Sequence, residues 1–312
     1  MPAIYAHDVV VARSAIILGL DLDAFAASFV DVSDTPFLVV RADAKESQKW
    51  SHLLGVPARR CYISDDKLVE RAQAGNVASS VITAAKIPDP GSVMSGDFGE
   101  ILTAFYLAIR SRPALVIDPA RWRYKADRRK AAPGSDVVQM MLPRWPDSSA
   151  DDRILCAEVK TKATKGSFDP IEAAGAGSAT DRGGRLVNTL EWLKDKALTD
   201  GSDLVEIAQL DRFLQAIDHP QASWEFCAVA VIDSDFVRDE IAKGTAPTHG
   251  ECALIVISVP ELKKRYTELF DAIVACADQP GGTPDSVPGQ SVTTATPAPG
   301  CRLEGAVEPL DR

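Results

Sequence analysis

A glutamate and a lysine lie two residues apart at the end of an apolar segment, Glu158 and Lys160 with Val159 between them. The segment 153–159 has the composition of a buried strand, in which alternate side chains share a face. Glu158 and Lys160 are therefore expected to point to the same side, with Val159 pointing into the core behind them. A carboxylate and an ammonium group side by side can serve the hydrolysis of a phosphodiester.

Asp136 supplies a second carboxylate. It follows a turn at residues 133–135 and opens the apolar segment 137–142, so a neighbouring strand can bring it beside Glu158. A hard divalent cation prefers one or two carboxylates and fills its other positions with water and phosphate oxygens. We predict Asp136 and Glu158 as ligands of Mg²⁺ or Mn²⁺, and Lys160 as the group that positions or deprotonates a water. The alternative is a solvated, salt-bridged strand with Asp136 as a turn residue only.

Glu100 lies in another apolar segment. Residues 98–109 contain one charged side chain, which predicts a largely buried helix. A buried carboxylate needs a partner, and we expect a metal ion or Lys160 to provide it. Glu100 is thus a further candidate catalytic residue. In the alternative interpretation, Asp97 and Glu100 form a capping box at the start of the helix.

Residues 121–130 interleave cations with aromatic rings, a composition suited to phosphate contacts and base stacking. A solvated basic loop is the competing interpretation. Arg182, in a small-residue loop expected over residues 175–184, and Arg185, at the start of the next helix, either hold phosphate or lie on the surface. The candidate nucleic-acid contacts are Arg121, Arg123, Lys125, Arg128, Arg129 and Lys130.

The charge distribution favours the same part of the chain. The 34 Lys and Arg against 44 Asp and Glu give a net charge of −10. Residues 110–165 hold 13 of the basic and 7 of the acidic side chains, so this window carries +6 and the remainder −16. Because net negative charge opposes loose binding to a phosphate backbone, we expect nucleic-acid contacts in this window and delivery of the substrate by a partner.

The elements that must position these residues alternate between helix and strand. The order indicates an α/β fold with a mixed central sheet flanked by helices. From residue 91 it runs: helix 97–110, strands 115–117, 136–142 and 154–160, helices 186–196 and 204–217, strand 226–232, helix 235–243, strand 254–259, and a helix with Pro260 in its first turn that reaches residue 275.

Three regions follow from composition. Residues 1–90 are expected to form an α/β accessory region, since they hold no catalytic motif and a Pro- and Gly-rich turn closes them. Residues 91–277 form the domain with the site, and residues 278–312, rich in Pro, Gly, Ser and Thr, are expected to be disordered. The apolar runs are too short for a membrane helix and no basic leader precedes them, so we expect a cytoplasmic protein without a membrane partner.

Four blocks of the sequence resemble the HamA family, the nuclease subunits of Hachiman anti-phage defence systems. They are residues 96–102, 122–125, 134–136 and 158–161, and the segment 228–234 is similar as well. The resemblance implies a PD-(D/E)XK restriction-endonuclease-like core, DNA cleavage supported by Mg²⁺, and a HamB-like helicase partner that hydrolyses ATP. It implies that Asp136, Glu158 and Lys160 form the catalytic motif and that Glu100 is the acid of the preceding helix.

Two other functions stay open at this point. One is a non-catalytic adaptor that uses the same fold to bind nucleic acid or a helicase, and the acidic residues with Lys160 argue against it. The other is a ribonuclease effector, which the sequence does not separate from a deoxyribonuclease.

Overall fold

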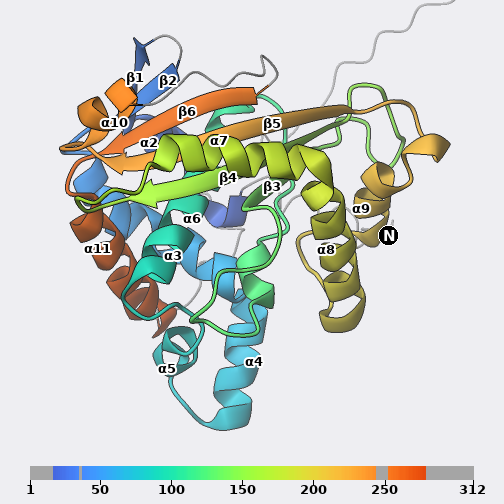
Figure 1. The fold of residues 1–312 in the computed structure, drawn as a ribbon. Coiled ribbons are helices and arrows are strands. Elements are labelled where there is room, and N and C mark those ends of the chain that lie inside the picture. The colour runs from blue at the N-terminus through green and yellow to red at the C-terminus, as the bar shows by residue number, and fades with distance from the viewer. Residues whose placement is uncertain (1–16, 35–36, 244–251, 279–312) are drawn as a thin grey trace, which may run out of the picture. The chain divides into compact units, whose positions relative to one another are not determined.

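A mixed sheet lies at the centre of the computed structural model, which describes residues 17–34, 37–243 and 252–278. Within these residues the strand order is β1-β2-β6-β5-β4-β3 (Figure 1). Neighbours from β2 to β4 run parallel, and β1 and β3 add antiparallel edges. The predicted α/β class with a mixed sheet is confirmed. The strands are β1 (Phe29–Asp34), β2 (Phe37–Ala42), β3 (Val137–Met141), β4 (Arg153–Lys162), β5 (Ser223–Asp233) and β6 (Cys252–Val259).

Helices cover both faces of this sheet, as a run of parallel strands requires. One face packs on α3 (Trp50–Tyr62), α6 (Ser92–Arg110) and α11 (Leu262–Ala275), with Val159 of β4 in that core. The opposite face carries α7 (Pro170–Thr180), α8 (Leu186–Asp200), α9 (Ile207–Leu214) and α10 (Val237–Lys243), and Figure 1 shows α7 lying across β4 and β5. Glu158 and Lys160 alternate with Val159 and therefore face α7.

Smaller helices complete the described chain. They are α2 (Leu22–Ala26), α4 (Asp65–Gly75) and α5 (Ser79–Ala84), with the short 3₁₀ turns η1 (Ile17–Gly19), η2 (Ser47–Lys49), η3 (Arg121–Tyr124), η5 (Ala216–Asp218) and η6 (Cys276–Asp278). Strands β1 and β2 belong to the same sheet as β4, so the sheet spans both sides of the boundary expected near residue 90. The predicted tail, residues 278–312, lies outside the described residues except for Asp278, which ends η6. No helix among the described residues is long and apolar enough to cross a membrane.

Several predicted elements are wrong in detail. The strand expected at 115–117 is one bridge between Ile117 and Met140, because this chain meets the edge strand β3 at a single position. The helix expected from residue 97 starts at Ser92, and α11 starts at Leu262, after Pro260 rather than with it.

The largest error concerns residues 175–184, which sequence composition predicts as a loop. They form the end of α7 and a π-helical turn, η4 (Asp181–Arg185), that joins α7 to α8. Small residues without helical periodicity look like a loop, but here they let α7 lie close to the sheet. A Cβ on Gly177 would run into the Glu158 carboxylate. Gly184 has a φ of 123°, a conformation that glycine adopts without strain.

Candidate active site

Two neighbouring strands bring Asp136, Glu158 and Lys160 together. Asp136 directly precedes Val137, which pairs with Ala157, so Asp136 comes opposite Glu158. Its Oδ2 accepts a hydrogen bond from the backbone N–H of Val159 at 2.9 Å and lies 3.8 Å from the Lys160 ammonium. Lys160 also donates to Glu158 Oε1 and to the Val159 carbonyl. The sequence prediction that these three residues meet agrees with their positions.

The burial of these groups differs. Glu158 is 4% exposed, whereas the Lys160 side chain is 30% exposed. Burial, together with the charge of Asp136, raises the pKa of Glu158 against the opposing effect of Lys160 and Arg185. The site therefore combines a buried glutamate and a half-buried aspartate with a cation that solvent can reach.

Arg185 belongs to this cluster, although sequence composition gives it no stronger claim than Arg182. Its Nη2 donates to Glu158 Oε2 and, at 2.9 Å, to the carbonyl of Gly177. Its Nε donates to Asp181 Oδ1 at 2.6 Å. The π-helical turn brings Arg185, its last residue and the N-cap of α8, back over β4, and no local sequence signal specifies that turn.

The turn that presents Asp136 is anchored on the same helices. The backbone N–H of Ser135 donates to Thr189 Oγ1 of α8 at 2.9 Å, and the Ser135 hydroxyl donates to Asp181 Oδ1 at 2.6 Å. Gly134 has a φ of 89° and packs against Thr189. These contacts hold Asp136 and Arg185 in one connected network.

Glu100 lies behind Asp136 and has different partners from those expected. Its Oε2 accepts hydrogen bonds from Arg121 Nη2 at 2.7 Å and from the Trp122 indole at 2.8 Å, in place of a bond from Lys160. Arg121 Nη2 also donates to Asp136 Oδ1 at 3.2 Å, so the guanidinium links the two carboxylates. Burial raises the pKa of Glu100 to about 8 despite the charge of Arg121.

The capping-box interpretation of Glu100 is wrong. Helix α6 begins five residues before Asp97, and its N-cap is Gly91. Asp97 is buried inside the helix, where it accepts hydrogen bonds from the Tyr62 hydroxyl at 2.7 Å and from Lys125 at 2.9 Å. Two acids three residues apart in an apolar segment are compatible with the first turn of a helix and with its interior. Only their partners from distant parts of the chain show that they lie in the interior.

The basic segment 121–130 is not one exposed loop. The side chains of Arg121 and Lys125 are 3% exposed, and both are engaged in ion pairs with acids of α6. Arg123 pairs with Asp203 and donates to the Arg60 carbonyl at 2.8 Å. The structure thus shows Arg121, Arg123 and Lys125 engaged inside the protein rather than as free surface cations, and their contact with nucleic acid stays a prediction.

The remaining cations of that segment lie nearer the solvent. Arg128 pairs with Asp89 at 2.6 Å, and its side chain is 38% exposed. Arg129 pairs with Asp127 at 3.2 Å and is 73% exposed, and Lys130 is exposed. Arg128, Arg129 and Lys130 stay predicted contacts, and within the part of the chain that the structure describes their ion pairs are with Asp89 and Asp127 rather than with the acidic cluster.

The donor set at Asp136 and Glu158 fits a hard divalent cation of the kind that keeps several waters. Among the described residues no group of three or more His, Cys, Asp or Glu side chains is arranged to hold a metal ion. Mg²⁺ commonly takes one or two carboxylates and completes its shell with water and phosphate oxygens. Glu158, whose pKa is raised by burial and then by the charge of Asp136, and the facing Asp136 match that requirement.

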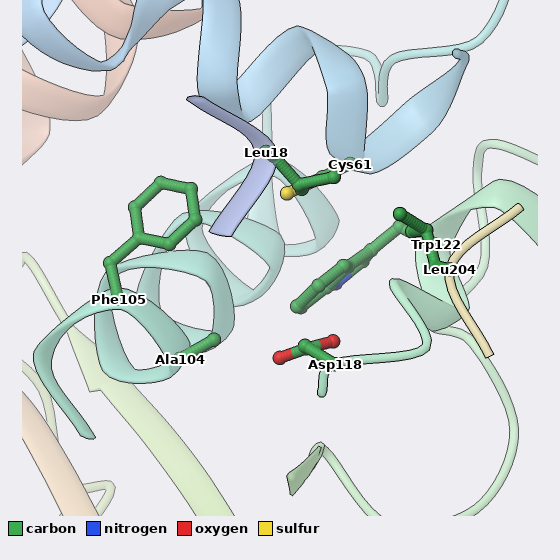
Figure 2. A pocket seen from close by; sticks show the side chains of 7 residues that line it. All are labelled: Leu18, Cys61, Ala104, Phe105, Asp118, Trp122 and Leu204. Atoms are coloured by element: carbon green, nitrogen blue, oxygen red, sulfur yellow. The ribbon is translucent and has the colours of Figure 1, made fainter. Parts of the chain in front are cut away.

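A small closed cavity lies beside this region but is not a substrate site. Figure 2 shows its lining, in which Trp122, Phe105 and Cys61 are apolar neighbours and Asp118 is the acid. The cavity measures about 10 Å³, the space of about one water. Asp118 accepts hydrogen bonds from the Ala120 N–H at 2.8 Å and Gln139 at 3.2 Å, which gives it a structural role.

The fold and the cluster together define an α/β protein with an acid–lysine site at the edge of a mixed sheet. The chain belongs to the HamA family, whose family model matches residues 22–273 and so covers most of the sequence. This membership supports the association with Hachiman anti-phage defence that the resemblance implies. No protein with a curated description matches the chain.

Proposed function

We propose that the protein is a metal-dependent deoxyribonuclease of the PD-(D/E)XK type and the effector subunit of a Hachiman defence complex. One observation carries the proposal: the Lys160 ammonium donates to Glu158 and lies 3.8 Å from Asp136, on a cluster that is open to solvent at the lysine. Membership in the HamA family adds the defence context.

Asp136 and Glu158 would hold Mg²⁺ or Mn²⁺. The ion, when bound, lowers the pKa of a water and neutralises charge that grows on the phosphate. The backbone N–H of Val159 donates to one oxygen of Asp136, and Arg121 donates to the other. The carboxylate pair is thus held in place before any ligand arrives, as an efficient site requires.

Lys160 would act on the water or on the phosphate. Its side chain is 30% exposed, so its ammonium can exchange a carboxylate contact for an oxygen of the substrate. The two acids beside it keep the cation oriented toward the point where a phosphate would meet them. Lys160 is therefore assigned as the residue that orients the attacking water and stabilises the developing charge.

Glu100 is better described as a positioning residue than as a catalytic one. It touches Arg121 and Trp122, and it reaches the acidic pair through the Arg121 guanidinium. Arg121 additionally donates to the Asp136 carbonyl at 2.6 Å. Glu100 and Arg121 would fix the orientation of Asp136 without contact with the substrate.

A helicase partner would supply most of the affinity for DNA. The net charge of −10 repels a phosphate backbone, and many cations of the positive window are engaged in ion pairs. A HamB-like ATP-dependent helicase would deliver the strand, and Arg128, Arg129 and Lys130 would contact it at the periphery. The protein alone is then expected to bind DNA weakly at physiological salt.

The test is a cleavage assay with the full-length protein, alone and with its helicase partner, on DNA and on RNA. Cleavage of DNA is expected with Mg²⁺ or Mn²⁺ and not with EDTA. Asp136→Asn should abolish it, while Asp151→Asn, which changes an exposed partner of Arg144, should not. Cleavage in EDTA would remove the metal mechanism, cleavage of RNA alone would make the protein a ribonuclease, and metal-supported binding without cleavage would favour an adaptor.

A further inference from the structure

Arg185 differs from the other arginines near the site in what it contacts. Its Nε is anchored on Asp181, which is 1% exposed and also accepts from Ser135, the residue before Asp136. Its Nη2 contacts Glu158 and the Gly177 carbonyl. Among the described residues no acceptor bonds to its Nη1, and the side chain is 28% exposed. The Nε side of the guanidinium is fixed on Asp181, and the side chain as a whole is part-exposed.

Glu158 has a cation on each oxygen. Lys160 donates to Oε1 and Arg185 to Oε2. A divalent cation that ligates Glu158 must displace at least one of them. Lys160 retains contacts with Asp136 and the Val159 carbonyl, and Arg185 retains Asp181 and the Gly177 carbonyl, so either cation stays in the site after displacement.

Charge balance gives the displaced arginine a new role. Asp136 and Glu158 are neutralised by Lys160 and Arg185, so the cluster has little attraction for an anion in this state. A metal ion on the two carboxylates adds two positive charges to the cluster, while Arg185 keeps Asp181 as a counter-ion. The cluster as a whole then attracts an anion more strongly, and the guanidinium atoms released from Glu158 are free to meet it. A planar guanidinium with two adjacent free N–H groups binds phosphate in a bidentate fashion, which an ammonium group does not.

We infer that Arg185 is a phosphate-binding residue that leaves Glu158 when this carboxylate binds a divalent metal, so that one guanidinium links metal binding to binding of the substrate phosphate. The inference rests on the proposed nuclease function. Asp181, which anchors Arg185, lies on the π-helical turn with Gly184, and such turns are frequent at functional sites.

The inference predicts opposite effects of one substitution on two ligands. In Arg185→Gln the competitor for Glu158 is gone, so the affinity of the DNA-free protein for Mn²⁺ should rise by about tenfold, as expected for the loss of one charge-assisted bond. The affinity for a DNA oligonucleotide in Ca²⁺ should fall by about tenfold for the same reason. Arg185→Lys should give values between those of the wild type and Arg185→Gln in both measurements, because a lysine keeps the charge but lacks the two adjacent N–H donors of the guanidinium.

Electron paramagnetic resonance of free Mn²⁺ and fluorescence anisotropy of a labelled oligonucleotide, both on the full chain, measure these two quantities. The matched control is Arg153→Gln, at the other end of β4, where the arginine pairs with Glu225 at 3.2 Å and is 37% exposed. That variant should leave both affinities unchanged. Melting temperatures of all variants identify any that fail to fold.

If Arg185 has a purely structural role, the substitution should lower the affinities for Mn²⁺ and for DNA together, or change neither. Unchanged or weaker Mn²⁺ binding in Arg185→Gln, or unchanged DNA binding, overturns the inference. The proposed function is judged separately, and it still holds if the wild type cleaves DNA in the presence of metal. If Glu158→Gln does not weaken Mn²⁺ binding and the wild type does not cleave, the proposed function fails and the inference fails with it.

Discussion

Two lysines on the same face of β4 have different environments, and the comparison separates chemistry from structure. Lys162 is 5% exposed, and its ammonium donates to Glu240 at 2.8 Å and to the carbonyls of Gly166 and Phe168 at 3.0 and 2.6 Å. Lys160 is 30% exposed and borders two carboxylates that face each other. A lysine with every donor used inside the protein stabilises the fold, whereas one that stays open beside an acidic pair can act on a ligand.

The glutamates that partner these lysines provide the largest contrast. Glu158→Gln is expected to lower the cleavage rate by about 10³-fold, because a bound metal contributes several kcal/mol to catalysis. Glu240→Gln, at the partner of Lys162, is expected to leave the rate per folded molecule unchanged. Initial cleavage rates at equal concentrations of folded protein measure both. Equal reductions of the rate in the two variants would contradict the assignment of one pair to catalysis and the other to the fold.

Two glycines of α7, which packs over Glu158 and Lys160, test how closely this helix contacts the site. Gly177→Ala would push a methyl group into the Glu158 carboxylate, which should destabilise the protein by about 1–3 kcal/mol and reduce cleavage. Gly175→Ala meets no neighbour within 4 Å and should stabilise the helix by about 0.5–1 kcal/mol. Chemical denaturation and cleavage rates measure both, and a harmless Gly177→Ala would mean that α7 does not press on Glu158.

Lys162→Met tests the structural half of the comparison. The substitution removes the donor to two carbonyls and to Glu240, and Lys243 remains as a partner of Glu240 at 2.9 Å. We expect a loss of about 1–3 kcal/mol in the free energy of unfolding, the usual cost of buried acceptors without a donor. Urea unfolding measures it. An unchanged unfolding free energy would show that Lys162 is not a structural residue.

A separate test concerns Glu100 and the pH dependence of stability. Burial raises its folded-state pKa to about 8, above the ordinary value of 4.5, so the folded state holds a proton that the unfolded state has released at neutral pH. The stability from this proton is fully present below about pH 4.5 and is lost as the pH rises toward 8. In Glu100→Gln, which still accepts from Arg121 and Trp122, unfolding free energy should vary less between pH 5 and 8. An equal slope in both proteins would contradict the raised pKa.

Local patterns in the sequence were enough to predict which residues lie together at the centre of the candidate site. Period-two alternation gives the shared face of Glu158 and Lys160, the turn before Asp136 gives its place at the strand edge, and the apolar helix gives the burial of Glu100. The same patterns do not distinguish Lys160 from Lys162, since both lie on that face, and the difference depends on Glu240 78 residues away.

The errors have the same physical origin. Arg121 and Lys125 pair with Glu100 and Asp97, which lie 21 and 28 residues upstream, so composition alone describes them as a basic loop. Helix α7 shows no apolar stripe in its sequence, and its closest approach to Glu158 is at one small residue, Gly177. The position of Arg185 depends on that helix, so its place in the cluster could not be predicted from the sequence.

The most direct test of the central claim compares cleavage by Lys160→Met and Lys162→Met with that of the wild type, in Mg²⁺ and with the helicase partner, at equal concentrations of folded protein. Lys160→Met should cleave about 10²–10⁴-fold more slowly, the range for loss of a positioned acid or base group, with a nearly unchanged melting temperature. Lys162→Met should keep the rate and lose stability. Wild-type cleavage by Lys160→Met would contradict the assignment of the acid–lysine cluster as the active site.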